Sequence, residues 1–264
     1  MATSDELYQK GTEVLGRFRS GGGTGGIKGS PSYDAMPGLQ RLVTEWAFGG
    51  TWSRPVLDIK YRCMATISAL TVLGREQQLK NHVRNALGAG LTKEQIAEVM
   101  LHVMPHGGAP ATLNGLRIAM EVFQERPDLP YNPEPIVPAQ TEKERYDKAA
   151  EVRQKVYGKD GIRPVIRHGE VYDMDFAKQT IGYIFGVIWS RKTLDLQSRI
   201  VCTLSALTAM RLEPQIPNHV RAALNLGLTQ DQIMELFSHL MLYGGWDASI
   251  NAMARANDAF HGRA

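Results

Sequence analysis

Two histidines, His82 and His219, have the side chain and the surroundings that proton transfer requires. Each stands in the run Asn-His-Val-Arg, at the edge of an apolar stripe with helical spacing. Imidazole titrates near neutral pH, so it can give a proton to carbon or a hydrogen bond to an oxyanion. A lone histidine on such a face is more often a hydrogen-bonded core residue, but the recurrence favours a functional role.

Two arginines are repeated in the same way. Arg62 and Arg199 each lie in a segment that is typical of a helix with apolar residues on most of its circumference. A guanidinium in such a place requires an anion beside it. The sequence leaves two partners open, a carboxylate of the protein itself or a carboxylate of a bound ligand.

A third repeated pair is Glu98 with His102, which recurs as Glu235 with His239. In each copy the two side chains lie opposite the apolar stripe of their helix, on a face that contacts either solvent or another unit. The simplest expectation is a weak, exposed ion pair.

His106 extends the spacing of Glu98 and His102 toward that of a metal site. Two observations weigh against such a site. Pro105 distorts the helix at this point, and Tyr243 takes the place of His106 in the second copy. We therefore predict no metal centre and keep His106 as a candidate pocket residue.

These repeated groups belong to an internal duplication, whose offset is the 137 residues that separate position 82 from position 219. Residues 48–123 align without a gap on residues 185–260. The sequence therefore predicts a first helical domain over 1–125, a stiff proline-rich linker over 126–140 and a second helical domain over 141–264.

The elements that must position these side chains are helices, because no segment shows the sustained alternation of a strand. We predict an all-α fold, with helices over 56–73 and 76–89 in the first unit. Ser53 is expected to cap the first of these. Thr92 with Gln95 forms the capping-box pattern that opens the next helix.

Composition limits the function classes. The net charge of +3 is spread along the chain without a Lys/Arg block, so we expect neither nucleic acid nor a membrane surface as partner. A small anionic substrate remains compatible. No apolar leader or spanning run is present, which predicts a cytoplasmic protein. Cys63 and Cys202 are not at equivalent positions and are expected to be buried side chains.

One further stretch, the glycine-rich run at residues 20–32, lacks the Gly-Lys-Ser/Thr signature of a phosphate loop. It is interpreted as a flexible loop or lid.

Four stretches together resemble the γ-carboxymuconolactone decarboxylase family. They are Glu45 to Pro55, Leu70 to Glu76, Leu79 to Ala86 and Gly107 to Ala111. The resemblance covers nearly the whole first unit and the helical half of the second. It implies an AhpD-like fold of two tandem helical units packed as a pseudo-dimer. The family's single units assemble as hexamers, so this chain is expected to form a homo-oligomer, a trimer with six pseudo-equivalent units.

The same superfamily contains peroxidase-like disulfide reductases that carry Cys-x-x-Cys followed by histidine. Arg75 and Gln78 stand at those two cysteine positions, and only His82 matches. Thiolate chemistry is therefore not expected.

The resemblance implies a decarboxylase of a small carboxylated lactone, in aromatic-compound catabolism, that needs no cofactor. Losing CO2 leaves electrons that the unsaturated lactone can delocalise to its carbonyl. The protein must seat carboxylates, stabilise the enolate and return one proton to carbon. The predicted catalytic residues are His82, Glu45 and His106, and the predicted substrate-binding residues are Arg54, Arg62, Trp52, His219 and Arg199.

Two alternatives stay open at this point. A related lyase or isomerase acting on another β-keto or lactone acid would use the same residues. A non-catalytic oligomeric protein would instead satisfy its arginines and histidines internally, with no pocket between them.

Overall fold

A computed structural model describes residues 2–23, 31–137, 141–158 and 181–263. In these residues the chain is helical and contains no strand, which confirms the all-α prediction. Residues 24–30, the centre of the predicted glycine-rich loop, lie outside the described residues, as do 138–140 of the predicted linker. No described helix is long and apolar enough to cross a membrane.

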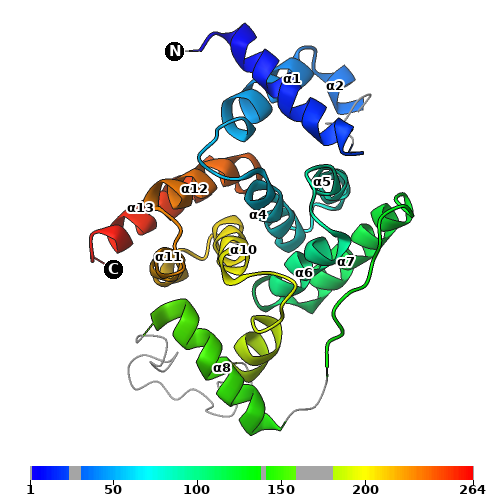
Figure 1. Cartoon of the computed structure of the whole chain (residues 1–264). Coiled ribbons are helices and arrows are strands. Elements are labelled where there is room, and N and C mark those ends of the chain that lie inside the picture. Colours follow the sequence, from blue (N-terminus) through cyan, green and yellow to red (C-terminus); the bar gives the residue numbers. More distant parts are fainter. Residues whose placement is uncertain (1, 24–30, 138–140, 159–180, 264) are drawn as a thin grey trace.

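The two units repeat one series of helices (Figure 1). The first unit contains α1 (Ser4–Ser20), α2 (Pro31–Ala35), α3 (Leu39–Leu42), η1 (Val43–Trp52), α4 (Ile59–Val72), α5 (Glu76–Gly88), α6 (Lys93–His102) and α7 (Met104–Gln124). The second contains α8 (Glu142–Tyr157), η3 (Gly182–Ile188), α10 (Leu196–Ala209), η4 (Glu213–Gln215), α11 (Ile216–Asn225), α12 (Gln230–Gly244) and α13 (Trp246–Phe260).

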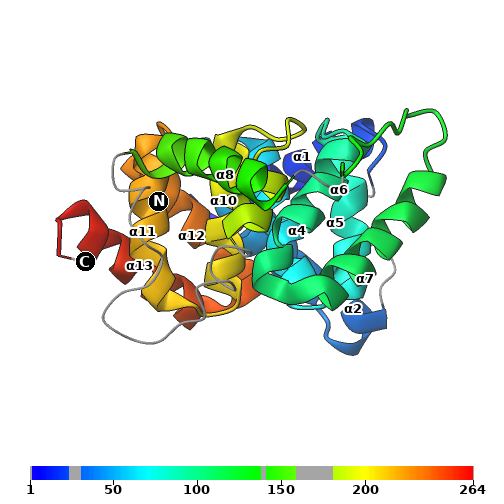
Figure 2. The same ribbon diagram turned by 90° about the horizontal axis from the view of Figure 1, so that it is seen from below.

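The equivalent helices α4 and α10 lie side by side at the centre of the molecule (Figures 1 and 2). Both are buried around nearly their whole circumference, because every residue from Arg62 to Thr71 is buried, as is every residue from Ser198 to Ala209. Helix α12 of the second unit also packs on α4, and α6 of the first unit packs on α10. This exchange confirms the pseudo-dimer, and it brings side chains of both units to each central helix.

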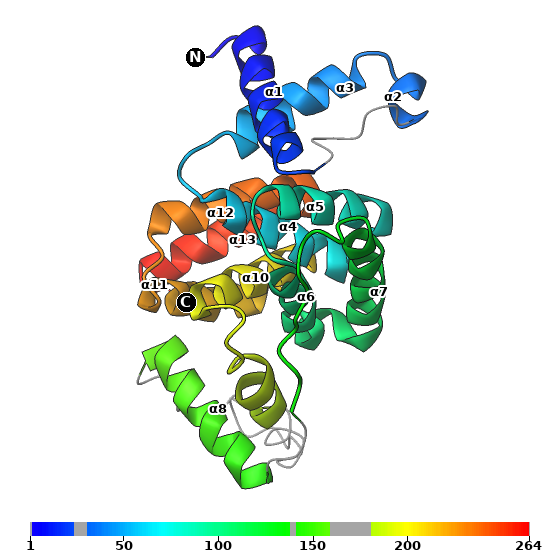
Figure 3. The ribbon, with the colours of Figure 1, turned by 45° about the vertical axis from the view of Figure 1, so that its right-hand side comes forward.

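Helices α1 and α8 lie at opposite ends of the molecule, and each covers a π-helical segment of its own unit (Figure 3). The close approach requires glycine. A Cβ atom on Gly11 would stand 2.1 Å from the carbonyl oxygen of Thr44, and one on Gly186 would stand 2.2 Å from that of Arg145. The packing of α1 thereby fixes η1, the segment that ends in Trp52.

Of the two helix starts predicted from capping residues in the first unit, one is confirmed and one is wrong. Thr92 accepts a hydrogen bond from the backbone of Gln95 and completes the predicted capping box. The prediction that Ser53 caps the helix over 56–73, which is α4, was wrong. Asp58 caps it, by accepting from the Lys60 backbone at 2.8 Å, whereas the Ser53 hydroxyl donates back to Gly49.

The described part of the proline-rich linker is bound along its length to both units. Lys93 donates to the carbonyl oxygens of Arg126 and Leu129 at 2.7 and 2.8 Å. Farther along, Arg191 of the second unit donates to the carbonyl oxygen of Glu134. The linker therefore acts as a docked segment in addition to spacing the units.

Candidate functional site

Each buried arginine finds its anion in the opposite unit. Nη2 of Arg62 lies 2.7 Å from Oε1 of Glu235, and Nη2 of Arg199 lies 2.8 Å from Oε1 of Glu98. Neither guanidinium has any exposed surface. Of the two partners that the sequence left open, the protein's own carboxylate is the one present. The prediction that Arg62 and Arg199 bind substrate carboxylates is therefore corrected, because these side chains have no free surface to offer.

The prediction of an exposed Glu98–His102 ion pair was also wrong. Both residues are buried against α10, because the face opposite their apolar stripe forms the contact between units. Glu235 and His239 are buried in the same way against α4.

The hydrogen bonds fix the protonation of His239 and His102. Nδ1 of His239 lies 3.4 Å from Nη1 of Arg62, and a guanidinium can only donate, so Nδ1 accepts and Nε2 carries the proton. Nε2 then donates to the Thr66 hydroxyl at 2.9 Å. His102 repeats the arrangement with Arg199 and Thr203 at 3.3 and 2.9 Å. Burial, and then the neighbouring arginine, hold the pKa of both histidines well below the usual value.

Replacing Glu235 with glutamine is expected to lower the free energy of unfolding by about 3–5 kcal/mol, because Arg62 would stay buried without a counter-charge. Glu98→Gln should lower it by a similar amount, since Arg199 occupies the equivalent place. Urea denaturation of each variant measures both effects. The matched surface control is Glu121→Gln, whose pairs with Lys80 and Arg117 are partly exposed and should contribute far less to stability than the buried pairs. Equal losses for Glu235→Gln and Glu121→Gln would refute the buried-charge argument.

A cavity of about 300 Å³ lies next to this cluster, and His82 is part of its wall. The wall is built from both units, because η1 and α5 of the first unit meet the end of α12 from the second. It is lined by Tyr33, Val43, Trp46, Ala47, Phe48, Gln78, Asn81, His82, Asn85, Met241, Leu242 and Tyr243. Within the described part of the chain, none of these side chains carries a formal charge at neutral pH.

Trp52 packs behind the cavity wall and contacts two of its polar residues, His82 and Tyr243. Its ring stacks on His82 with 5.9 Å between centroids and 10° between planes, and its Nε1 donates to the Tyr243 hydroxyl at 3.0 Å. The edge of His239 packs on the same indole at 4.7 Å. Trp52 itself does not line the cavity. The prediction that it forms a pocket wall is therefore corrected: it supports the residues that do.

His82 and its neighbour Asn81 have unused hydrogen-bonding capacity. Nδ1 of His82 is buried, and no described residue forms a hydrogen bond with it. The neighbouring Asn81 keeps a buried Nδ2 without a partner, although its Oδ1 accepts from Arg84. Burial lowers the pKa of His82 to about 4, so the imidazole is neutral at pH 7. Buried polar atoms in native proteins are nearly always paired, so two adjacent exceptions on a cavity wall point to a ligand.

The equivalent histidine of the second unit is in a different state. Nδ1 of His219 lies 3.1 Å from the hydroxyl of Tyr157, at the end of α8. His106 lies near His219 and helps burial to lower its pKa to about 3. The prediction that His106 shares a pocket with His82 is corrected by this placement, since Tyr243 is its counterpart in the His82 cavity.

Two other predicted residues lie apart from His82. Glu45 does not line the cavity, and its carboxylate stands 3.8 Å from Arg41. Arg54 lines a separate hollow beside α12, with Glu235. Asn81, Asn85 and Tyr243 also line the wall and were not among the predicted site residues. The adjacency of Asn81 to His82 was visible in the repeated run, but the arrival of Tyr243 from the other unit was not.

Comparison with known proteins adds a family and three relatives. The family described as "Carboxymuconolactone decarboxylase family" matches twice, at residues 37–121 and 174–258. The 4-carboxymuconolactone decarboxylase of Acinetobacter baylyi is 32% identical over 119 residues, which cover 45% of this chain and 89% of that protein. An uncharacterised 15.0 kDa protein of Paracoccus denitrificans is 42% identical over 92 residues, covering 34% of this chain and 69% of its own. Nitrosuccinic acid decarboxylase of Metarhizium robertsii is 33% identical over 89 residues, covering 34% and 62% respectively.

Proposed function

The chain belongs to the carboxymuconolactone decarboxylase family, and from that premise we propose that it decarboxylates a small carboxylated lactone in the His82 cavity. The observation that carries the proposal is that His82 and Asn81, which line a cavity with ligand dimensions, each keep a buried polar atom without a partner, Nδ1 and Nδ2 respectively. The similarity to two proteins named as decarboxylases supports the reaction type.

An anionic substrate in this cavity, whose described lining is uncharged, would make His82 take up a proton. A lactone dicarboxylate is an anion, and no lysine or arginine among the described residues lines this cavity. A negative charge about 4 Å from the imidazole contributes about 4 kcal/mol at an effective dielectric constant of about 20. That is about three pKa units, enough to raise the pKa of His82 from about 4 to near neutrality. The substrate therefore brings one proton from solvent onto His82 as it binds.

This proton balances the reaction. The C–C bond to the carboxylate breaks, CO2 leaves, and the electron pair moves through the ring to the lactone carbonyl oxygen. Amide groups on the cavity wall, above all Nδ2 of Asn81, can donate hydrogen bonds to that developing oxyanion. His82 then gives its proton to carbon and returns to the neutral state that burial favours.

The direct test is CO2 release from 4-carboxymuconolactone by purified, chelator-treated protein. We expect release without an added cofactor, because the substrate accepts its own electrons. No release under these conditions would refute the lactone as substrate. Nitrosuccinic acid should be assayed in parallel, since its nitro group is also an electron sink and one relative is named for that acid.

The proton uptake predicts a pH dependence. The free enzyme has a His82 pKa of about 4, so above pH 5 the logarithm of kcat/KM should fall by about one unit for each pH unit. By contrast, kcat should stay level up to the raised pKa of the substrate complex. Initial rates from pH 5 to 8 measure both parameters. A level kcat/KM over this range would show that the proton comes from another group.

A further inference from the structure

The docked linker is held through its backbone in the manner of a bound peptide. Arg191 donates to two successive backbone carbonyl oxygens, those of Glu134 and Pro135, at 2.6 and 3.1 Å. The backbone N–H of Asn132 donates to the carboxylate of Glu94, in the first turn of α6. One acidic and one basic side chain thus bind the donors and acceptors of an extended backbone.

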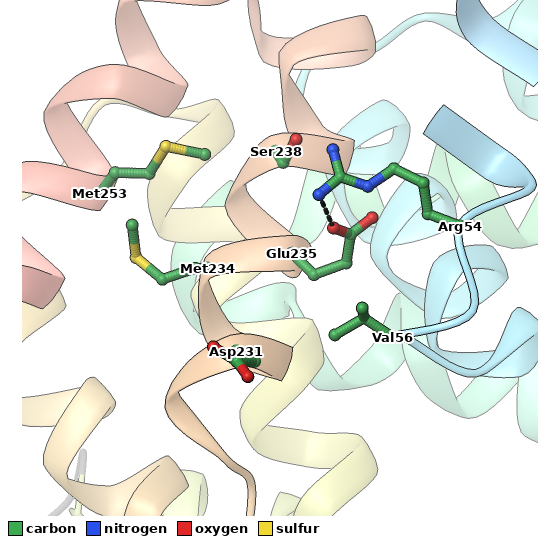
Figure 4. A pocket seen from close by; sticks show the side chains of 7 residues that line it. All are labelled: Arg54, Val56, Asp231, Met234, Glu235, Ser238 and Met253. Carbon is green, nitrogen blue, oxygen red and sulfur yellow. Dashed lines mark ion pairs between the residues drawn. The ribbon is translucent and has the colours of Figure 1, made fainter. Parts of the chain in front are cut away.

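The duplication places the same two groups beside α12. Asp231 is the equivalent of Glu94, and Arg54 is the equivalent of Arg191. Both line a hollow of about 270 Å³ (Figure 4). The figure shows Arg54 and Val56 on one side of α12 and Met253 on the other, with Asp231 on the helix itself.

The two arginines differ in what they bind. Each pairs with the buried glutamate of its cluster, since Arg54 lies 2.7 Å from Glu235 and Arg191 lies 2.9 Å from Glu98. The Arg191 side chain, with the linker on it, is 8% exposed, whereas that of Arg54 is 50% exposed. No described residue takes the place on Arg54 that the linker carbonyls take on Arg191.

The carboxylate of Glu235 only partly neutralises the charge of Arg54. Its other oxygen is already paired with the fully buried Arg62 at 2.7 Å, so two guanidinium groups share one carboxylate. A hydrogen-bond donor with surplus positive charge therefore faces the hollow, with an acceptor, Asp231, on the same wall. This is the arrangement in which Glu94 and Arg191 hold the linker.

We propose that the Arg54 hollow is a docking site for an extended, proline-containing segment of a partner protein, bound through its backbone. Arg54 donates to the carbonyl oxygens and the Asp231 carboxylate accepts from a backbone N–H, as their equivalents do for the linker. The partner segment supplies to Arg54 and Asp231 the backbone groups that residues 132–135 of the chain itself supply to Arg191 and Glu94.

The side chains that line the Arg54 hollow also determine which residue the bound segment carries at its centre. In the second unit the Glu134 carboxylate accepts from the Lys192 backbone and the Thr193 hydroxyl, both at 3.0 Å. In the first unit Pro55 has no N–H, and Val56 has no hydroxyl, at those positions. The hollow is lined there by Val56, Met234 and Met253. The central residue of the segment is therefore apolar, because a carboxylate would lose its hydration without gaining a donor.

The test uses the full chain and two fluorescent peptides, one with the linker sequence of residues 130–137 and one with valine in place of Glu134. We expect the valine peptide to bind at least fivefold more tightly in fluorescence anisotropy. Arg54→Gln should weaken its binding at least tenfold, and Asp231→Asn at least threefold. Asp231 is exposed, so its variant keeps the test informative if Arg54→Gln folds poorly.

A photo-crosslinking residue at the central position of the peptide locates the bound segment. Crosslinks to Met234 or Met253 are expected. Crosslinks to the region around Thr193, which would mean displacement of the linker, would overturn the proposal. So would a valine peptide that binds no more tightly than the glutamate peptide, binding that both variants leave unchanged, or the absence of binding at millimolar peptide.

Discussion

Replacing His82 with asparagine is expected to lower kcat for the proposed decarboxylation by about 10²- to 10⁴-fold, the range that a positioned proton donor contributes. Asparagine keeps a hydrogen-bonding group in the cavity but cannot carry the proton that the anionic substrate requires. The loss should fall on kcat more than on KM, because the amide can still bind a carboxylate oxygen. The variant should also lose the fall of kcat/KM between pH 5 and 8.

The duplication provides the matched control for this variant. His219→Asn makes the same change at the equivalent position, where the Tyr157 hydroxyl already lies 3.1 Å from Nδ1. We expect it to retain most of the activity, since that imidazole is engaged within the protein. Equal losses in the two variants would assign chemistry to both units. Wild-type kcat in His82→Asn would exclude His82 as the proton carrier.

Acid is expected to unfold the protein steeply between pH 6.5 and 4, because the fold holds several fully or partly buried histidines in the neutral state. Burial lowers the pKa of His82 and of His106 to about 4 and that of His219 to about 3, and it lowers those of His102 and His239 as well. In the unfolded chain each would titrate near 6.5. Above pH 6.5 both states are neutral and this contribution is constant. Below it only the unfolded state gains protons, so stability falls as pH falls.

Each buried histidine then removes about 1.4 kcal/mol of stability per pH unit between its unfolded and folded pKa values. Urea denaturation at pH 7, 6 and 5 measures the combined slope. The variant His106→Gln removes one titrating group and should reduce the slope by about that amount. A stability that does not change between pH 7 and 5 would contradict the neutral, buried state of these residues.

Local signals in the sequence were enough for the helices and for several of their ends. The capping box at Thr92 and the apolar stripe of α5 depend on residues within one or two turns of each other, which a linear pattern contains. Ser53 was misassigned because Asp58, another good cap, follows it and the chain between them is not helical.

The candidate site was predictable only where it is local. The repeated run identified His82, and its neighbour Asn81 was within reach of the same argument. The partners of Arg62 and the identity of Tyr243 as a wall residue depend on α12, which packs on α4 from the other unit. A pattern of one helix shows that a face is polar, but it does not show which helix will cover it.

The exchange of side chains between units imposes an order on biosynthesis. Arg62 is paired with Glu235, and 173 residues separate them along the chain. At a synthesis rate of about 5–20 residues per second, the first unit waits roughly 10–35 seconds for that glutamate to be translated. During this time α4 lacks both the counter-charge and the cover of α10 and α12, so its apolar surface is open to chaperones or to wrong partners. The nascent first half therefore cannot finish folding before α12 has left the ribosome.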